Sequence, residues 1–373
     1  MFDDDKYIDI SIFLLRLSQG RTFPNPTVAS IIVETEPNKD LHAIIGFGIT
    51  SKGGRPHAES NALDQIKIKK NFKYTLYSTL EPCSHIGRDT SCAKKIIDSG
   101  IKRVVFCLLD PDKRVRGKGR DMLQKNGVEV IYNVRVNEAY NLYKGYFLNK
   151  LKSRPKVVLK VATSIDGKIA EKPRTSTKIT SSSTNKFMHI LRSKFDGILV
   201  GSETVKIDNC KLDCRVQGLE EFSPVRIVLN KKLDLNPSYK IFKDCHKIKT
   251  ILITESSDTK KINQFKKKNV EVVCIPKSKY KISFILRILA KKNISNLLVE
   301  GGSKIFSSFL ASKYFDEIIV LRGNFFIGSS GIDILSSSRD DFLKKKFNLY
   351  QLSNLEDDVF EIYEAKSKKL TLE

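Results

Sequence analysis

Apolar residues along the first 150 positions follow two different spacings, and each spacing predicts its own kind of element. Helical spacing predicts helices at 7–18, 58–67 and 92–99 and near 122–126. Apolar runs, or alternating apolar and polar positions, predict strands at 28–33, 42–48, 74–80, 103–109 and 128–132. Strands that alternate with helices are typical of an α/β sheet with helices packed on its faces.

A polar and basic stretch, NKLKSRP at 149–155, interrupts this pattern and closes with a proline. A chain of 373 residues is also too long for one typical hydrophobic core. We therefore expect two domains, residues 1–150 and 151–373. The second domain repeats the alternation, with a helix at 185–194 and strands at 157–163, 197–200, 226–230, 250–254, 270–275 and 296–299. Both domains are thus predicted to be α/β.

The composition is that of a globular chain, with 40% hydrophobic residues and 21 Phe. The sequence has no run of 18 apolar residues, and it begins with the acidic segment MFDDDKYIDI. Neither a membrane span nor a signal peptide is therefore predicted. We expect a cytoplasmic protein whose seven cysteines stay reduced and are available as metal ligands or buried thiols.

The net charge of +24 admits two interpretations. Clustered lysines would suit a nucleic-acid partner, because they neutralise phosphates. The lysines are, however, spread along the chain, and the longest runs (Lys266 to Lys268 and Lys344 to Lys346) resemble solvated helix faces. We favour a compositional origin, with some attraction for small anionic substrates. No nucleic-acid or membrane partner is expected; a homo-oligomer is expected, of a size that the sequence does not specify.

The segment His57-Ala58-Glu59 is followed by Glu81-Pro82-Cys83 and then by Cys92, each at the edge of a predicted element. One imidazole and two thiolates are a ligand set for catalytic zinc, which keeps its fourth position for water and lowers the pKa of that water to about 7. Glu59 would then carry a proton from water to departing ammonia. A thiolate at a helix N-terminus is favoured by the helix dipole.

The step from Cys83 to Cys92 is longer than the two-residue gap of the common deaminase signature. The intervening loop SHIGRDTS is expected to bulge between the ligands and to form part of the active-site wall. A closed structural site is the alternative, with His85 as its fourth ligand. The full combination is more specific than any of its parts and favours one catalytic zinc ion per chain.

The segments FPNPTVAS, GRPHAE, TLEPCSHIGRDTSC and DPDKRVRGKG resemble the bacterial bifunctional riboflavin-biosynthesis family, a pyrimidine deaminase fused to a pyrimidine reductase. The resemblance implies a cytidine-deaminase-like α/β/α domain in which His57, Cys83 and Cys92 bind zinc. It implies that Glu59 is the proton donor and that Asn25 lies in the deaminase pocket. The chain departs from the family pattern in the pocket, where Phe23 and Thr50 replace histidines and Ala29-Ser30 replaces Gly-Cys.

The segments LKVATSIDGKIA, ITSSSTNKFMHILR, DGILVGSETVKID and LLVEGGSKIFSSFL resemble the reductase half of the same family. This implies a dihydrofolate-reductase-like α/β domain that uses NADPH. The implied cofactor contacts are Ala162, Lys178, Thr204, Asp208, Gly301 and Gly302. The implied substrate contacts are Ser176, Arg192, Leu212, Arg215 and Glu300. Two arginines suit a sugar phosphate, because a guanidinium holds phosphate oxygens in pairs.

The turn Glu300-Gly301-Gly302-Ser303 follows a predicted strand and opens a helix. Bare N–H groups and the helix dipole would suit a dinucleotide phosphate there, although glycines are also common in ordinary turns. The turn lacks the G-x-G-x-x-G fingerprint, which argues against a Rossmann domain. This half also departs from the family pattern, at Asn209-Cys210, at Asn230 and at Lys178, where an aromatic residue is frequent.

The leading hypothesis is a two-step enzyme of riboflavin biosynthesis. The first domain would hydrolyse the ring amino group of 2,5-diamino-6-(5-phosphoribosylamino)pyrimidin-4(3H)-one. The second would pass a hydride from NADPH to C1 of the ribosyl group and give the ribitylamino product. One alternative is a nucleic-acid base deaminase with a basic binding domain, which leaves the second domain unexplained. Another is a zinc scaffold without activity, against which the intact ligand set and Glu59 speak.

Overall fold

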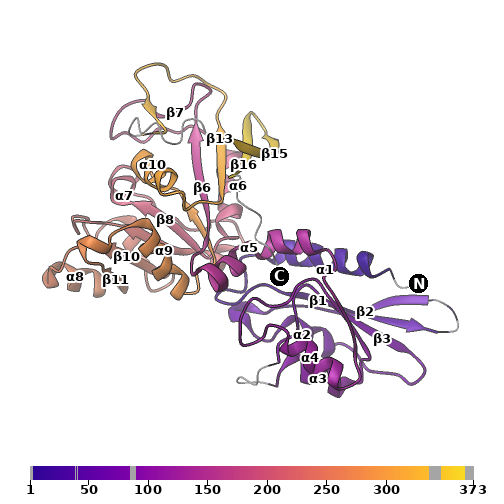
Figure 1. Ribbon diagram of the computed structural model, residues 1–373. Coiled ribbons are helices and arrows are strands. Elements are labelled where there is room, and N and C mark those ends of the chain that lie inside the picture. Colours follow the sequence, from indigo (N-terminus) through magenta and orange to yellow (C-terminus); the bar gives the residue numbers. More distant parts are fainter. Residues whose placement is uncertain (1–2, 38, 40, 85–89, 336–345, 366–373) are drawn as a thin grey trace. The chain divides into compact units, whose positions relative to one another are not determined.

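The computed structural model describes residues 3–37, 39, 41–84, 90–335 and 346–365. The chain forms two compact units, residues 1–153 and 154–373 (Figure 1). The polar stretch NKLKSRP is not a linker throughout, because helix α5 (Val136–Lys152) extends through its first four residues. Lys150 and Lys152 in the last turn of α5 favour this helix end, where the helix dipole attracts positive charge.

The first unit is built on a five-stranded sheet with the order β2-β1-β3-β4-β5. Strand β1 is antiparallel to β2 and β3, whereas β3, β4 and β5 are parallel. All five predicted strands are present, with the bounds Ala29–Glu36 (β1), Leu41–Ile49 (β2), Lys73–Ser78 (β3), Arg103–Phe106 (β4) and Glu129–Tyr132 (β5). The parallel strands point the segments after β3 and β4 toward the same edge of the sheet.

Helices cover both faces of this sheet, which confirms the α/β/α prediction (Figure 1). Helices α1 (Asp4–Ser18) and α5 share one hydrophobic core. The other face carries α2 (Ala58–Leu63), α3 (Cys92–Ser99) and α4 (Lys118–Lys125). The prediction did not include α5, although its buried residues Ala139, Tyr143 and Phe147 recur every four positions.

Helix α2 is shorter than the predicted helix at 58–67. The side-chain amide of Gln65 forms two hydrogen bonds with strand β2. Its Oε1 accepts from the N–H of Phe47 at 3.2 Å, and its Nε2 donates to the carbonyl of Phe47. These two bonds use an edge strand's free backbone groups, which would otherwise face solvent. The side chain therefore competes with helix continuation at this point.

The second unit contains a nine-stranded sheet with the order β11-β10-β9-β8-β12-β6-β13-β16-β15. The seven strands from β11 to β13 are parallel, and the hairpin β15–β16 pairs antiparallel at one edge. The strand bounds are Lys156–Thr163 (β6), Gly197–Gly201 (β8), Val225–Leu229 (β9), Thr250–Thr254 (β10), Val270–Cys274 (β11), Asn296–Val299 (β12), Glu317–Arg322 (β13), Phe347–Leu355 (β15) and Asp358–Ala365 (β16). The six predicted strands are present; β13, β15 and β16 were not predicted.

A separate two-stranded sheet pairs β7 (Lys168–Ala170) with β14 (Ile332–Asp333). The helices of the second unit are α6 (Ser182–Arg192), α7 (Ser202–Asp208), α8 (Thr259–Lys266), α9 (Ile282–Lys291) and α10 (Ser303–Ser312). Short 3-10 turns occupy Lys52–Gly54, Glu220–Phe222, Lys240–Phe242 and Lys277–Lys279. The α/β class predicted for this half is thus confirmed.

The predicted cofactor and substrate residues of the second unit lie mainly near the carboxyl ends of neighbouring parallel strands. Strands β8, β12 and β6 are adjacent, and their carboxyl ends point the same way. Ligands of open α/β sheets bind outside such carboxyl ends. Residues just after β8 and β12, and at the end of β6, are therefore brought together.

Within the described residues, no helix has both the length and the apolar character that crossing a bilayer requires. Lys266 to Lys268 are exposed at the end of α8, as expected, whereas Lys344 and Lys345 lie outside the described residues.

Candidate functional site

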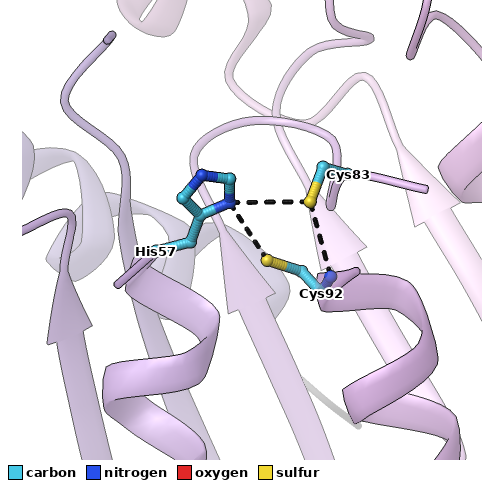
Figure 2. Close-up of side chains that lie close together, drawn as sticks. All are labelled: His57, Cys83 and Cys92. Carbon is cyan, nitrogen blue, oxygen red and sulfur yellow. Dashed lines mark hydrogen bonds between the residues drawn. The ribbon is translucent and has the colours of Figure 1, made fainter. Parts of the chain in front are cut away.

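The three predicted metal ligands converge at the ends of three elements of the first unit (Figure 2). His57 is the residue before α2, Cys92 is the first residue of α3, and Cys83 lies in the segment after β3. Their ligand atoms all lie within 4.8 Å of one another. Nδ1 of His57 is 3.2 Å from Sγ of Cys92 and 3.5 Å from Sγ of Cys83.

This geometry fits a zinc ion. Bonds of about 2.1 Å to nitrogen and about 2.3 Å to sulfur in a tetrahedron place nitrogen and sulfur about 3.6 Å apart. The observed separations are close to this value, and they identify Nδ1 as the imidazole atom that faces the thiols. Three protein donors would leave one position open, as in catalytic sites. His85, the fourth ligand of a closed site, lies outside the described residues.

The thiols lie in an environment that prepares one of them to lose its proton. Hydrogen bonds from the Cys92 side chain, the His57 imidazole and the Cys92 backbone N–H lower the pKa of Cys83, although burial opposes them. The same contact with Cys83, together with burial, raises the pKa of Cys92. The pKa of His57 is raised, chiefly by its hydrogen bond to Cys83. A divalent cation held by this donor set would favour both thiolates.

Glu59 lies in the first turn of α2 and is 3% exposed. Burial raises the pKa of its carboxyl to about 7, although the charge of His57 opposes this shift. The carboxyl also interacts with the side chains of Cys83 and Cys92. The helix therefore brings a proton-carrying group to the same place as the ligand His57.

Asn25 lies beside the loop that leads into His57. Its Nδ2 donates to the carbonyl of Gly54 at 3.3 Å. Gly54 has a φ of +89°, and a Cβ there would collide with the amide of Asn25. The two loops carry the cis bonds Phe23-Pro24 and Arg55-Pro56. A contact that only glycine permits thus joins Asn25, the predicted pocket residue, to Gly54, which precedes the metal ligand His57 by three positions.

Thr50, one of the departures from the family pattern, has a structural role. Its side-chain Oγ1 accepts from the backbone N–H of Val28 at 3.0 Å, and it is 6% exposed. It therefore joins the start of β1 to the end of β2. Phe23 is half-buried, and Ala29 and Ser30 are buried at the start of β1.

In the second unit, two predicted substrate residues bind each other. Nε and the Nη2 nitrogen of Arg192 donate to the two carboxylate oxygens of Glu300, both at 2.9 Å. Burial alone would raise the pKa of Glu300, but the guanidinium lowers it to about 2. The remaining nitrogen of Arg192 donates to the carbonyl of Asp213 at 3.3 Å. The side chain of Arg192 is therefore held by two other residues of the protein, and its predicted contact with the substrate stays a prediction.

Lys160 is a residue of this cluster that the sequence analysis missed. It follows Leu159, which pairs with Val299 across β6 and β12, so that it lies next to Glu300. Burial lowers the pKa of its ammonium, while Glu300 and Asp208 act in the opposite direction. The signal was a single lysine inside the apolar strand VVLKVAT, because unpaired lysines are rarely placed in a core.

The predicted cofactor residues gather only in part. The N–H of Gly302 donates to Oγ1 of Thr204 at 3.0 Å, so this N–H is not bare as expected. The glycines do lie between β12 and α10, as predicted, with Gly302 as the cap residue of α10. Ala162 lies near the end of β6, and Asp208 is the exposed last residue of α7.

The other predicted residues of this half lie on loops. Ser176 and Lys178 are exposed in the loop between β7 and α6. Leu212 is buried with a φ of +54°, and Arg215 is 60% exposed, with Nε 3.3 Å from the carboxylate of Asp213. Arg215 is thus the more accessible of the two arginines.

Three other residues that depart from the family pattern, Asn209, Cys210 and Asn230, are part of the local structure of the second unit. Asn209 ends α7 in the left-handed region at a φ of +43°, which asparagine tolerates well, and its Oδ1 accepts from the N–H of Lys240 at 2.9 Å. Asn230 is 1% exposed, donates to Asp234 at 2.6 Å and accepts from the N–H of Leu235. Cys210 is a half-buried thiol whose pKa burial raises to about 12.

Comparison with known proteins finds relatives that cover both units. Residues 1–108 match the family model of the cytidine and deoxycytidylate deaminase zinc-binding region, and residues 155–359 match that of the RibD C-terminal domain. The chain is 37% identical to the riboflavin biosynthesis protein RibD of Aquifex aeolicus, over 93% of this chain and 96% of that relative. It is 34% identical to the protein of the same name from Bacillus amyloliquefaciens, over 84% and 83%.

Solved structures show the same similarity over both units. RibD of Acinetobacter baumannii superimposes with a TM-score of 0.86 at 26% identity, over 98% of this chain and 99% of that one. A diaminohydroxyphosphoribosylaminopyrimidine deaminase/5-amino-6-(5-phosphoribosylamino)uracil reductase of Thermotoga maritima gives 0.81 at 29% identity, over 97% and 98%. The nucleic-acid deaminase alternative is not favoured by these relatives. The chain belongs to the RibD family and is a bifunctional enzyme of riboflavin biosynthesis, with a zinc-binding deaminase region and a reductase domain.

Proposed function

We propose that the first unit hydrolyses the ring amino group of 2,5-diamino-6-(5-phosphoribosylamino)pyrimidin-4(3H)-one. The observation that carries this proposal is the convergence of His57, Cys83 and Cys92 around one point, with Glu59 buried beside them. The name of the Thermotoga maritima structure, which includes diaminohydroxyphosphoribosylaminopyrimidine deaminase, supports the choice of substrate.

In this proposal His57, Cys83 and Cys92 hold one zinc ion. When bound, zinc supplies a Lewis acid that makes water a nucleophile near neutral pH. Glu59 accepts a proton from the attacking water and gives it to the ring amino group. A C–O bond forms as the C–N bond breaks, and ammonia leaves. Asn25 lies at the edge of this site, where its amide is held toward Gly54 and can orient the pyrimidine.

We propose that the second unit reduces the phosphoribosyl group with NADPH, which supplies the hydride that C1 of the ribosyl group receives. The residues that support this lie at or after the carboxyl ends of β6, β8 and β12: Ala162, Thr204, Asp208, Glu300, Gly301 and Gly302. The Gly302 turn supports a phosphate site because it opens a helix of ten residues and lacks side-chain bulk; the N–H of Gly302 itself is bonded to Thr204. The name of the Thermotoga maritima structure also includes a uracil reductase.

Within this reductase site we assign different roles to the two arginines. Arg215 has an exposed guanidinium and is the ligand for the sugar phosphate. Arg192 holds Glu300 in a fixed orientation, so that the carboxylate can accept hydrogen bonds from the substrate. Three further residues lie on loops of this unit: Ser176 and Leu212 are proposed to contact the substrate, and Lys178 the cofactor.

The experiment supplies the phosphorylated diaminopyrimidine to the purified chain with and without NADPH. Ammonia release and NADPH absorbance are followed separately. We expect ammonia in both reactions and NADPH oxidation only after deamination. Ammonia without any substrate-dependent oxidation of NADPH would contradict the reductase assignment; oxidation of NADPH without ammonia would contradict the order of the two steps.

A further inference from the structure

Glu81 stands two residues before the metal ligand Cys83, and only 3% of its surface is exposed. Its carboxylate accepts three backbone N–H groups of one segment: those of Asp110 at 3.1 Å, Gly117 at 3.0 Å and Arg120 at 3.1 Å. Its own backbone N–H donates to the carbonyl of Leu108 at 2.9 Å. A buried carboxylate with three donors is stabilised without a cation. Glu81 is therefore fully engaged by residues 108–120.

Glu81 caps the N-terminus of helix α4, although it lies far from this helix in the sequence. Gly117 is the cap residue of α4 and makes no side-chain cap bond. The N–H groups of Gly117 and Arg120 bond instead to Glu81, which precedes them by 36 and 39 positions. A negative charge at this helix end is also favoured by the helix dipole. Glu81 therefore joins the start of α4 to the turn that carries Cys83.

Gly119, in the first turn of α4, is in direct contact with the same turn. A Cβ at this position would collide with the carbonyl oxygen of Pro82 and would lie 3.2 Å from Oε1 of Glu81. The backbone of α4 thus lies against the peptide group that links Pro82 to Cys83. This peptide has no room to move toward α4.

Helix α3 fixes Cys83 from the other side. The N–H of Ala93 donates to the carbonyl of Cys83 at 3.0 Å, and the N–H of Cys92 donates to its Sγ at 3.4 Å. The segment before Cys83 is held by α4, and Cys83 itself is held by α3. Contacts with both helices therefore surround the turn that carries Cys83.

We propose that Glu81 and Gly119 are positioning residues for the metal: they hold Cys83 at the separation from the other two ligands that zinc requires. Neither residue binds zinc or the substrate. This inference rests on the zinc site of the proposed function. Contacts behind the ligands of a metal typically change its affinity by about 10- to 100-fold when they are removed.

Two variants disturb the turn that carries Cys83, one by removing a hydrogen-bond acceptor and the other by adding a methyl group. Glu81→Gln turns one acceptor oxygen into an amino group that faces a backbone N–H donor. Gly119→Ala keeps the charge and places a methyl group against the carbonyl of Pro82. Zinc affinity of the full chain is measured by competition with a chromogenic chelator, below the unfolding temperature of each variant. We expect both variants to bind zinc at least tenfold more weakly. Added zinc should restore their ammonia release.

The control is Asp121→Asn, which removes a half-exposed carboxylate from the same first turn of α4 and does not touch Glu81. It should bind zinc as the natural chain does. A natural chain that binds no zinc would refute the metal site itself. If the natural chain binds zinc and both Glu81→Gln and Gly119→Ala bind it equally tightly, the positioning role is overturned, even if their unfolding temperatures fall.

Discussion

Arg192 and Glu300 are separated by 108 positions in the sequence, yet their side chains form a two-pronged ion pair with both N–O distances at 2.9 Å. The pair is mostly shielded from solvent, with 14% of the arginine and 8% of the glutamate side chain exposed. Such planar pairs are among the strongest charge-assisted hydrogen bonds. Glu300 is therefore kept ionised and fixed at the carboxyl end of β12.

Replacing Arg192 by Leu should destabilise the second unit, because it leaves the carboxylate of Glu300 buried without its partner. Breaking such a pair costs about 3 to 5 kcal/mol in the free energy of unfolding. We expect chemical unfolding to show this loss and NADPH oxidation to disappear, while ammonia release continues. The matched control is Lys249→Met, which breaks a more exposed pair with Glu271, leaves Glu271 paired with Lys292, and should cost about 1 kcal/mol or less. Equal costs for the two variants would contradict the role given to Arg192.

Replacing Lys160 by Met tests the half-buried lysine of the same cluster. Methionine has a similar length and removes the cost of burying an ammonium, so the free energy of unfolding should change little. If the ammonium helps to bind the anionic substrate, NADPH oxidation should fall at least tenfold, mainly through a higher KM. Ammonia release should not change. Unaltered steady-state kinetics in the reductase assay would show that Lys160 only fills space.

The deaminase site could be predicted from the sequence because its residues lie at the ends of elements that follow one another closely. His57 and Cys92 begin α2 and α3, and the strand between these helices delivers Cys83. What the sequence did not show is the support behind the ligands. The three backbone N–H groups that donate to Glu81 are brought together by the fold of residues 108–120. A carboxylate that accepts from backbone N–H groups has no recognisable sequence motif.

The reductase site was harder to predict because it depends on strand order. Lys160 lies next to Glu300 only because β6 lies beside β12 in the sheet, and hydrophobic periodicity does not specify such neighbours. The family resemblance placed Arg192 and Glu300 in one site but gave each a contact with substrate. The structure adds that they bind each other.

Replacing Glu59 by Gln should abolish ammonia release and leave zinc bound, at about one ion per chain. Glutamine keeps the shape of the side chain but cannot accept and return a proton. A loss of at least 100-fold in kcat is expected, since general acid–base catalysis contributes about that much or more. Glu129→Gln, on an exposed side chain of β5, is the control and should keep full activity. Zinc content is measured beside the rate, and a fast variant would refute the assigned role.

Asp196 should make the second unit less stable as the pH rises from about 4 to 6. Its carboxylate accepts the N–H groups of Ser295 and Asn296 at 2.9 and 2.7 Å, but burial raises its pKa from 3.8 to about 6. The folded chain therefore binds this proton more tightly than the unfolded chain. The resulting stability is fully present below pH 3.8 and is lost as the pH passes through 6, with a total change of up to about 3 kcal/mol.

Asp196→Asn keeps an acceptor oxygen and cannot ionise, so this part of the pH dependence should vanish. The measurement is the free energy of unfolding of the variant and the natural chain at pH 4 and pH 7, compared as a difference so that other titrating groups cancel. The variant should gain stability relative to the natural chain on going from pH 4 to pH 7. Asp333→Asn, which changes a 70% exposed carboxylate, should show no such gain. A constant difference between the natural chain and Asp196→Asn would mean that Asp196 keeps its ordinary pKa when folded.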